Sequence, residues 1–414
     1  MWHVWLMTAG PNGHSGQPVI VAGAGPVGMV AAAWLVGAGI PVVLVEAEPV
    51  PKTDWRASTF HAATLELLER LDITDAMREE GLAVPVYHFR DRRAGLIAEF
   101  DFTLLADETR YPYRLQLNQQ HLVRMLYERL SQQDGVRLMF GAQVVDVSTD
   151  ATGATAVVRT ADGTHSLRGS HLIGADGAAS TVRQALDIGF DGYTYPERFL
   201  IASTTLDLRE QVPGLAYVNY VADPIQWLFI LRTQESWRAV WPVPAEQSPT
   251  EATSEATLQA QFQALAPYEP GYPIVDSQLY NVHQRVASTF RRGNVMLVGD
   301  AAHINSPIGG VGLNSGIHDA VDVARRIVRI RAGDGDPEAE LDTFAEIRRR
   351  VAVEYVQADT QRNTERLKEA DEARRKATHE QMRAIAADPD RARDYMRRVS
   401  LLESVRRFGV GLPP

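Results

Sequence analysis

The sequence predicts an α/β fold, with an inserted antiparallel sheet of α+β character and a C-terminal helical region. Three observations support this prediction. Residues 19–46 alternate between β-branched and alanine-rich runs, apolar strands at residues 172–175 and 295–298 end in glycine and aspartate, and short aromatic runs fill residues 190–285. Uniformly apolar strands are typical of a parallel sheet that is buried on both faces, whereas alternating strands are typical of an antiparallel sheet with one covered face.

The opening segment raises the question of a membrane helix. No charged side chain occurs from Ser15 to Val45, a stretch longer than the ~20 apolar residues that a membrane span needs. The composition changes partway, however, from β-branched residues to an alanine-rich run and back, and glycines and prolines interrupt it. The segment therefore indicates a strand, helix and second strand of a Rossmann-like βαβ unit.

Three glycines mark the turn between the first strand and the helix. Gly23, Gly25 and Gly28 form a G-x-G-x-x-G pattern, in which the first allows a tight turn, the second lets the backbone approach a pyrophosphate and the third lets the helix pack on the strand. The pyrophosphate would bind N–H groups at the helix N-terminus. Glu46, which ends the second strand, can accept hydrogen bonds from ribose hydroxyls. The pattern predicts a dinucleotide site without distinguishing NAD, NADP and FAD.

Composition excludes several other classes of protein. The net charge of −10 argues against nucleic acid or an anionic membrane as a partner. The absence of cysteine excludes disulfides, thiolate metal sites and a cysteine nucleophile, and the histidines show no metal-ligand spacing, so no metal is predicted. No Walker A, G-x-S-x-G or H-E-x-x-H motif occurs. Residues 1–18 lack the features of a signal peptide and are expected to form a flexible leader, which makes the cytoplasm the expected compartment.

Two downstream segments carry a family resemblance. The segment "LIGADGAASTVRQAL" at residues 172–186 matches D-G-x-x-S-x-V-R at every fixed position, and "VGDAAHINSPIGGVGLNSG" at residues 298–316 matches G-D-A-A-H-x-x-P-P-x-G-G-x-G-x-N-x-G except that Ser306 replaces the first proline. With the glycine pattern, these segments resemble the class A FAD-dependent monooxygenases of the p-hydroxybenzoate hydroxylase type. The resemblance covers roughly residues 19–350.

The resemblance implies how the glycine-rich loop would meet non-covalently bound FAD. Asp300 would accept a hydrogen bond from a ribityl hydroxyl, and Pro307 would lie beside the flavin ring. The helix after the loop would point its N-terminus at the pyrimidine edge of the flavin. Backbone N–H groups near Gly312, Leu313 and Asn314 would then stabilise negative charge on the reduced ring.

Three further positions are implied to bind cofactor. Asp176 matches the family acid that serves both FAD and NAD(P)H, although a cap on the turn after a strand is the alternative. Arg56 matches an arginine near the FAD diphosphate and the nicotinamide path. Gln119 keeps the glutamine of the family's Q-x-x-L-E-x-x-L pattern, whereas Val123 replaces its glutamate.

Catalytic roles are less specified by motifs. His61 is the candidate base that deprotonates the substrate, since an imidazole titrates near neutral pH; a histidine with a purely structural partner is the alternative. Arg238 follows a tryptophan, as in the family's W-R pattern near the flavin, and an ion pair at a sheet edge is the alternative. The aromatic residues of the middle segment line a substrate cavity or belong to the core, the latter being commoner: Tyr217, Tyr220, Trp227, Phe229 and Trp241.

The resemblance also divides the chain. The predicted parts are a leader at 1–18, an FAD-binding domain at 19–83, 115–185 and 286–335, a substrate-binding β-sheet domain at 84–114 and 186–285, and C-terminal helices at 336–414. The pairs Asp336-Pro337 and Asp388-Pro389 each predict a helix start with a capping aspartate. The mixed-charge run at 366–383 is expected to be a solvated helix face.

The resulting functional prediction is a single-component aromatic hydroxylase, either a monomer or a homodimer. NADH or NADPH would reduce FAD, O₂ would add to give a flavin C4a-hydroperoxide, and its distal oxygen would pass to a small electron-rich aromatic ring, phenolic or heteroaromatic. Two alternatives stay open. One is another reaction on the same cofactor, namely a halogenase, an epoxidase or an isoprenoid reductase, and the other is a redox-idle FAD-binding module.

Overall fold

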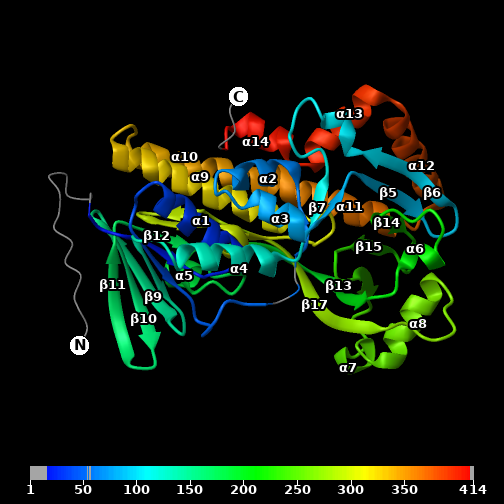
Figure 1. Ribbon diagram of the computed structural model, residues 1–414, viewed down its shortest axis with the longest axis horizontal. Helices are drawn as coiled ribbons and strands as arrows, with labels where there is room; N and C mark the ends of the chain where they lie inside the picture. The colour runs from blue at the N-terminus through cyan, green and yellow to red at the C-terminus, as the bar shows by residue number, and fades with distance from the viewer. Residues whose placement is uncertain (1–15, 54, 56, 411–414) are drawn as a thin grey trace.

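The computed structural model describes residues 16–53, 55 and 57–410. In Figure 1 a parallel sheet and its covering helices lie on the left, an antiparallel sheet lies on the right, and the C-terminal helices run along the top of both. No helix in these described ranges combines the length and the apolar character needed to cross a membrane. The predicted α/β fold class with an antiparallel insertion is confirmed.

The parallel sheet forms the predicted βαβ unit and extends it. Its strands run in the order β18 (Arg291–Arg292), β19 (Val295–Leu297), β12 (His171–Gly174), β1 (Val19–Ala22), β2 (Val42–Val45) and β8 (Val136–Met139), and all neighbours are parallel except β18 and β19. Helices α1 (Pro26–Gly37), α4 (Gln119–Leu130) and α9 (Gly312–Ala332) pack together beside it. Because helices and loops cover the sheet, its apolar strands are buried, which explains the uncharged opening segment.

Smaller elements complete this half of the molecule. A three-stranded antiparallel sheet holds β9 (Gln143–Asp150), β10 (Gly153–Thr160) and β11 (Gly163–Gly169), and another holds β3 (Thr59–Phe60), β7 (Arg114–Gln116) and β4 (Leu82–Val84). The short helices are α2 (Ala62–Glu69), α3 (Thr74–Glu80), α5 (Thr181–Ala185), η1 (Phe102–Leu105) and η2 (Gly299–Ala301).

The antiparallel sheet has eight strands. Their order is β20 (His303–Ile304), β17 (Ile274–Ala287), β13 (Phe190–Thr204), β16 (Trp237–Val243), β15 (Leu228–Arg232), β14 (Val218–Ala222), β5 (Val86–Asp91) and β6 (Gly95–Asp101). Helices α6 (Leu208–Gln211), α7 (Pro249–Ala252) and α8 (Glu255–Leu265) accompany it. These strands come mainly from the two segments predicted to bind substrate, while β20 belongs to the glycine-rich loop that begins at Asp300. The sheet therefore brings that loop next to the predicted substrate region, and the division into domains stays a proposal.

The C-terminal region is helical, as predicted. Asp336 caps α10 (Pro337–Val351) by accepting from the N–H of Ala339, and Asp388 caps α13 (Pro389–Val399) by accepting from the N–H groups of Asp390 and Arg391. A π-helical segment, η3 (Ala352–Gln357), joins α10 to α11 (Ala358–Lys368), and α12 (Glu372–Ala387) and α14 (Leu402–Phe408) complete the set. Both predicted helix starts are confirmed.

One expectation about this region is wrong. The run at 366–383 was expected to be a solvated face, but Leu367, His379 and Met382 are buried. Helix α12 lies against the strand pair β5 and β6 (Figure 1), so one side of the charged helix covers the sheet. A helix whose sequence shows few apolar residues can still bury one side when those few share a face.

Candidate active site

The glycine turn at the start of α1 has the shape of a phosphate cradle. Gly23 has φ +103°, and a Cβ there would lie 2.3 Å from the carbonyl oxygen of Ala175, while a Cβ at Gly28 would lie 1.9 Å from the carbonyl oxygen of Gly23. A Cβ at Gly25 would meet no atom within 4 Å. Packing therefore requires Gly23 and Gly28, whereas Gly25 borders open space in front of the unsatisfied N–H groups of α1. These features fit a bound pyrophosphate.

Glu46 stands across from this turn. One oxygen of its carboxylate accepts from the N–H of Ala24 at 2.7 Å, and the other accepts from the N–H of Glu48 at 3.0 Å. The side chain is half-buried, so each oxygen keeps acceptor capacity for another donor. The position suits the predicted contact with the adenosine ribose, which stays a prediction.

Replacing Glu46 with alanine should weaken FAD binding by roughly ten- to a hundredfold with the fold retained. A charge-assisted hydrogen bond to a ribose hydroxyl is worth about 1.5–3 kcal/mol. The dissociation constant of FAD can be measured by fluorescence titration of the apoprotein. The matched control is Glu48→Ala, because Glu48 is exposed and pairs with Lys52 across 3.5 Å. Equal affinity for FAD in wild type and Glu46→Ala would show that Glu46 does not contact the cofactor.

Five of the residues predicted to lie at the flavin line one cavity of about 210 Å³. Asp300, Pro307, Gly312 and Leu313 contribute from the glycine-rich loop and the start of α9, and Arg238 contributes from β16. Apolar side chains of the antiparallel sheet form another wall: Ile201, Phe229, Leu231 and Val240. The first turn of α9 has backbone N–H groups without intrahelical partners, and the positive end of the helix dipole faces this space. We call it the larger cavity.

Asn314 acts through its side chain as a brace for the loop. The side-chain oxygen accepts from the backbone N–H of His61 at 2.9 Å, and the side-chain nitrogen donates to the carbonyl oxygens of Thr59 and Gly310 at 2.8 and 2.6 Å. The side chain is fully buried. The predicted contact with flavin can therefore come only from its backbone.

Ser306 shows why the loop departs from the family's paired prolines. Its backbone N–H donates to the side-chain oxygen of Gln284 at 3.2 Å, which a proline could not do. Its hydroxyl lies 3.4 Å from that of Thr364 on α11. The substitution ties the loop to β17 and to the C-terminal helices.

Arg238 is a fixed cation in the wall of the larger cavity. Only 2% of the residue is exposed, and its guanidinium donates to Asn118 Oδ1 at 2.9 Å and to Ser58 Oγ at 3.3 Å. Burial lowers the pKa of the guanidinium, which nevertheless stays charged at neutral pH. Strand β16 lies between β13 and β15, so the alternative of an ion pair at a sheet edge is wrong. Neither Ser58 nor Asn118 was predicted, because no local pattern marks a residue that holds a distant arginine.

His61 occupies a different position from the one its predicted role needs. It is fully buried, does not line the larger cavity, and its Nε2 donates to the carbonyl oxygen of Gly309 at 3.1 Å. Burial, reinforced by the charge of Arg114, lowers the pKa of His61 to about 3. The geometry favours the alternative, a histidine held by a structural partner. A neutral imidazole that cannot take a proton near neutral pH is a poor base.

His61 and His318 together should make the fold sensitive to acid. His318, whose Nε2 lies 2.8 Å from Thr64 Oγ1, also has its pKa lowered by burial to about 3, from 6.5. Below pH 6.5 the unfolded chain binds protons that the folded chain does not, so the free energy of unfolding falls as pH drops toward 3. The two residues add a slope of about 2.7 kcal/mol per pH unit in this window.

Urea unfolding of wild type and the His61→Gln, His318→Gln double variant at a series of pH values measures this effect. The difference in the free energy of unfolding between the two proteins should be constant above about pH 7. As pH falls further, the variant should lose less stability than wild type. Parallel curves throughout would show that neither imidazole is neutral and buried.

The remaining predicted residues lie around the site. The carboxylate of Asp176 accepts from Ser180 Oγ at 2.5 Å and from the N–H of Val182 at 3.0 Å, and burial raises its pKa. It therefore caps the turn into α5, and any contact with FAD or NAD(P)H stays a prediction. Gln119 opens α4, and its backbone N–H donates to the carbonyl oxygen of Ala57, which lines the larger cavity. Arg56 lies outside the described residues.

A buried charged network supports the loop from behind, and no motif predicted it. Asp319 on α9 accepts from the backbone N–H of Gly299 at 3.0 Å and from His303 Nε2 at 2.8 Å, and Arg348 Nε donates to it at 2.6 Å. Arg348 and His303 together hold the pKa of Asp319 below its usual range. The network fixes the backbone on which Asp300 stands. The only sequence signal is a polar residue on the buried face of a helix.

Comparison with known proteins identifies the family. The model of the FAD binding domain family matches residues 17–359. The chain is 33% identical to para-nitrophenol 4-monooxygenase of Pseudomonas sp. (strain WBC-3), over 86% of this chain and 89% of that protein. It is 31% identical to 6-hydroxy-3-succinoylpyridine 3-monooxygenase of Pseudomonas putida (strain DSM 28022 / S16), over 94% and 98%.

Solved structures agree. The crystal structure of p-nitrophenol 4-monooxygenase from Pseudomonas putida DLL-E4 superposes with a TM-score of 0.88 at 30% identity, covering 94% of this chain and 98% of that one. A ternary complex of aklavinone-11 hydroxylase with FAD and aklavinone gives a TM-score of 0.75 at 25% identity, covering 87% and 70%. The glycine cradle and the larger cavity supply the sites that such a cofactor requires. The chain therefore belongs to the FAD binding domain family and is a class A FAD-dependent monooxygenase.

Proposed function

We propose that this enzyme hydroxylates a small, electron-rich aromatic compound, phenolic or heteroaromatic, with NADH or NADPH and O₂. The larger cavity carries the proposal, because one apolar pocket adjoins the loop and helix end that suit a flavin ring. The two relatives named above are monooxygenases of a nitrophenol and of a hydroxypyridine compound. Bound FAD would supply the redox and oxygen chemistry.

The chain's own residues hold the cofactor in this proposal. The cradle at Gly25 binds the pyrophosphate, Glu46 the adenosine ribose and Asp300 the ribityl chain. The N-terminus of α9 at Gly312 places backbone donors and a positive dipole where negative charge develops. No cysteine is available for a thioether link, and we expect the cofactor to be held non-covalently.

The sheet wall holds the aromatic ring and keeps water out. Four of the apolar side chains that line the larger cavity come from strands β13, β15 and β16: Ile201, Phe229, Leu231 and Val240. Arg238 adds one fixed positive charge, held in a single orientation by Ser58 and Asn118. Such a wall orients a flat substrate while its one cation selects for electron-rich groups.

Among the described residues that line the larger cavity, only Asp300 and Arg238 are titratable. Asp300 is assigned to the ribityl chain, and a guanidinium does not act as a base. A phenolic substrate would therefore bind already ionised, with no base beside its ring. We further propose that the enzyme acts in the cytoplasm, where NAD(P)H is available, as a monomer or homodimer.

A screen of aromatic compounds for stimulation of NAD(P)H oxidation tests the proposal. The purified protein should be yellow, with about one FAD per chain, and anaerobic NAD(P)H should bleach the flavin faster when a cognate compound is present. A redox-idle FAD module would not bleach at all. Product formation that depends on added halide would favour a halogenase.

A further inference from the structure

A second, smaller cavity borders the glycine-rich loop. Gly309 and Val311 line it, whereas Pro307, Ile308 and Gly310 line the larger cavity, so both cavities border the same loop. The ring of Tyr220, which lines the smaller cavity, is tilted against that of Phe229, which lines the larger one, and the ring centres lie 4.7 Å apart. Its volume of about 30 Å³ suits a water molecule or a small polar group.

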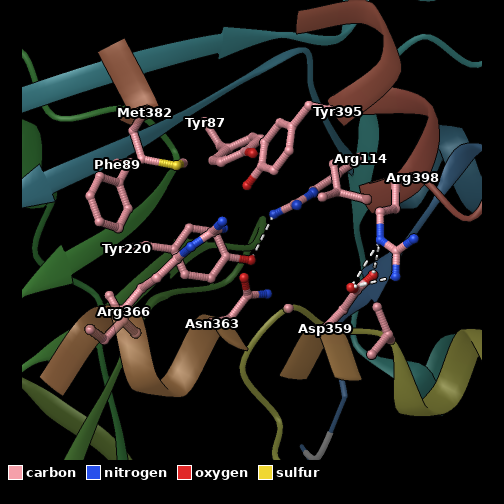
Figure 2. Close-up of a pocket in the computed structure, with 14 residues that line it drawn as sticks. Tyr87, Phe89, Arg114, Tyr220, Asp359, Asn363, Arg366, Met382, Tyr395 and Arg398 are labelled. Carbon is pink, nitrogen blue, oxygen red and sulfur yellow. Dashed lines mark hydrogen bonds and ion pairs between the residues drawn. The ribbon is translucent and has the colours of Figure 1, made fainter. Parts of the chain in front are cut away.

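Arg114 of β7 projects into this smaller cavity between aromatic rings, as Figure 2 shows. The residue is only 3% exposed. Its guanidinium carbon lies 4.5 Å from the ring centre of Tyr87, 5.3 Å from that of Phe102 and 5.7 Å from that of Tyr220. Nη1 donates to the hydroxyl of Tyr220 at 3.0 Å, and Nε has no hydrogen-bond partner.

No counter-charge for Arg114 is present in the part of the chain that the structure describes. Burial raises the pKa of both Tyr87 and Tyr220, so neither phenol ionises near neutral pH. Asp359, the carboxylate lining the same cavity, pairs with Arg398 across 2.9 Å (Figure 2). Arg366 also lines the cavity and adds a further positive charge.

A buried cation without a counter-ion is unfavourable, and another buried arginine of this protein has one. Arg348, buried to the same degree, has Asp319 at 2.6 Å. The aromatic rings around Arg114 offset part of the cost of desolvating its charge, but they do not neutralise it. The arrangement is therefore suited to binding an anion. This local positive charge contrasts with the net charge of −10 of the whole protein.

We propose that the smaller cavity receives the negatively charged group of the aromatic substrate, a phenolate or carboxylate oxygen, and that Arg114 is its counter-ion. The inference rests on the proposed function and deepens it, because it specifies an anionic aromatic substrate. It also explains the larger cavity, since a substrate that enters ionised and is matched by a buried arginine needs no base beside its ring. Specificity then comes from the charge on the substrate as well as its shape.

Two phenols of similar size test the proposal. At about pH 8, 4-nitrophenol is largely ionised, whereas 4-methylphenol has the pKa of a tyrosine side chain, about 10, and is neutral. In FAD-loaded Arg114→Met, the dissociation constant of 4-nitrophenol should rise by roughly thirtyfold or more, and that of 4-methylphenol by less than about threefold. Arg93→Met, an exposed arginine at the turn between β5 and β6, is the matched control and should change neither.

Thermal unfolding separates a binding role from a structural one. Without ligand, Arg114→Met should be at least as stable as wild type, because it removes a buried charge that has no counter-ion. 4-Nitrophenol should raise the melting temperature of wild type and leave that of the variant unchanged. A variant that melts well below wild type and weakens both phenols alike would overturn the proposal.

Two further outcomes are distinguishable. If no aromatic compound stimulates NAD(P)H oxidation, the proposed function fails. The dissociation constants of the two phenols would still show whether Arg114 binds an anion. If sodium nitrate raises the melting temperature of wild type but not of Arg114→Met, and neither phenol shows the difference in affinity, the cavity holds an inorganic anion and the substrate assignment is overturned.

Discussion

Gly25→Val should abolish FAD binding while leaving the fold intact. The backbone at Gly25 has φ −69° and ψ 177°, an extended conformation that valine adopts readily, and a Cβ there meets no protein atom. The added side chain would instead enter the space in front of the N-terminus of α1, where the pyrophosphate approaches. Affinity for FAD should fall by roughly a hundredfold or more, about 2.7 kcal/mol.

Gly28→Ala is the matched contrast, since its Cβ would lie 1.9 Å from the carbonyl oxygen of Gly23. This variant should lose about 3 kcal/mol of stability through overpacking, even without cofactor. Titration with FAD and urea unfolding of the apoprotein measure both effects. Retained FAD in Gly25→Val would place the pyrophosphate elsewhere, and unfolding of that variant would mean that Gly25 serves packing after all.

Arg348→Met should destabilise the protein by about 3–5 kcal/mol. It removes one partner of a fully buried ion pair and leaves Asp319 in the core with only a histidine and one backbone N–H. Asp342→Asn is the control. Asp342 is exposed, and its partner Arg291 keeps Glu338 as a second carboxylate, so removing this charge should cost less than about 1 kcal/mol.

Because Asp319 holds the backbone N–H of Gly299, the Arg348→Met variant should also bind FAD less tightly through Asp300. Urea unfolding of the apoproteins gives the loss of stability, and FAD titration gives the effect on the loop. Similar stabilities for the two variants would contradict the importance of the buried pair. Unchanged affinity for FAD would show that the buried charged network does not affect FAD binding through the loop.

Features encoded by neighbouring residues could be predicted from the sequence. The βαβ unit at residues 19–46, the strand that ends before Asp300 and the caps at Asp336 and Asp388 all follow from local patterns of turn, cap and apolar residues. Asp300, Pro307 and Gly312 were predicted by motif, and they line one cavity.

Features that depend on distant contacts could not be predicted. His61 has a pKa far from neutral because the fold buries it completely, against a loop about 250 positions away in the sequence. Likewise, the site of Arg238 depends on strand order, and Arg114 is unusual only because no carboxylate from anywhere in the described chain reaches it. Burial and the absence of a partner are properties of the whole fold, and no local pattern carries them.

The most direct test of the central claim is the source of the oxygen atom in the product. Wild-type enzyme with NAD(P)H and a cognate phenol under ¹⁸O₂ should incorporate one labelled oxygen atom into the aromatic product, and the other should appear as water. Mass spectrometry of the product distinguishes the sources. Label that enters the product from H₂¹⁸O, or product that forms without O₂, would contradict the assignment of this chain as a monooxygenase.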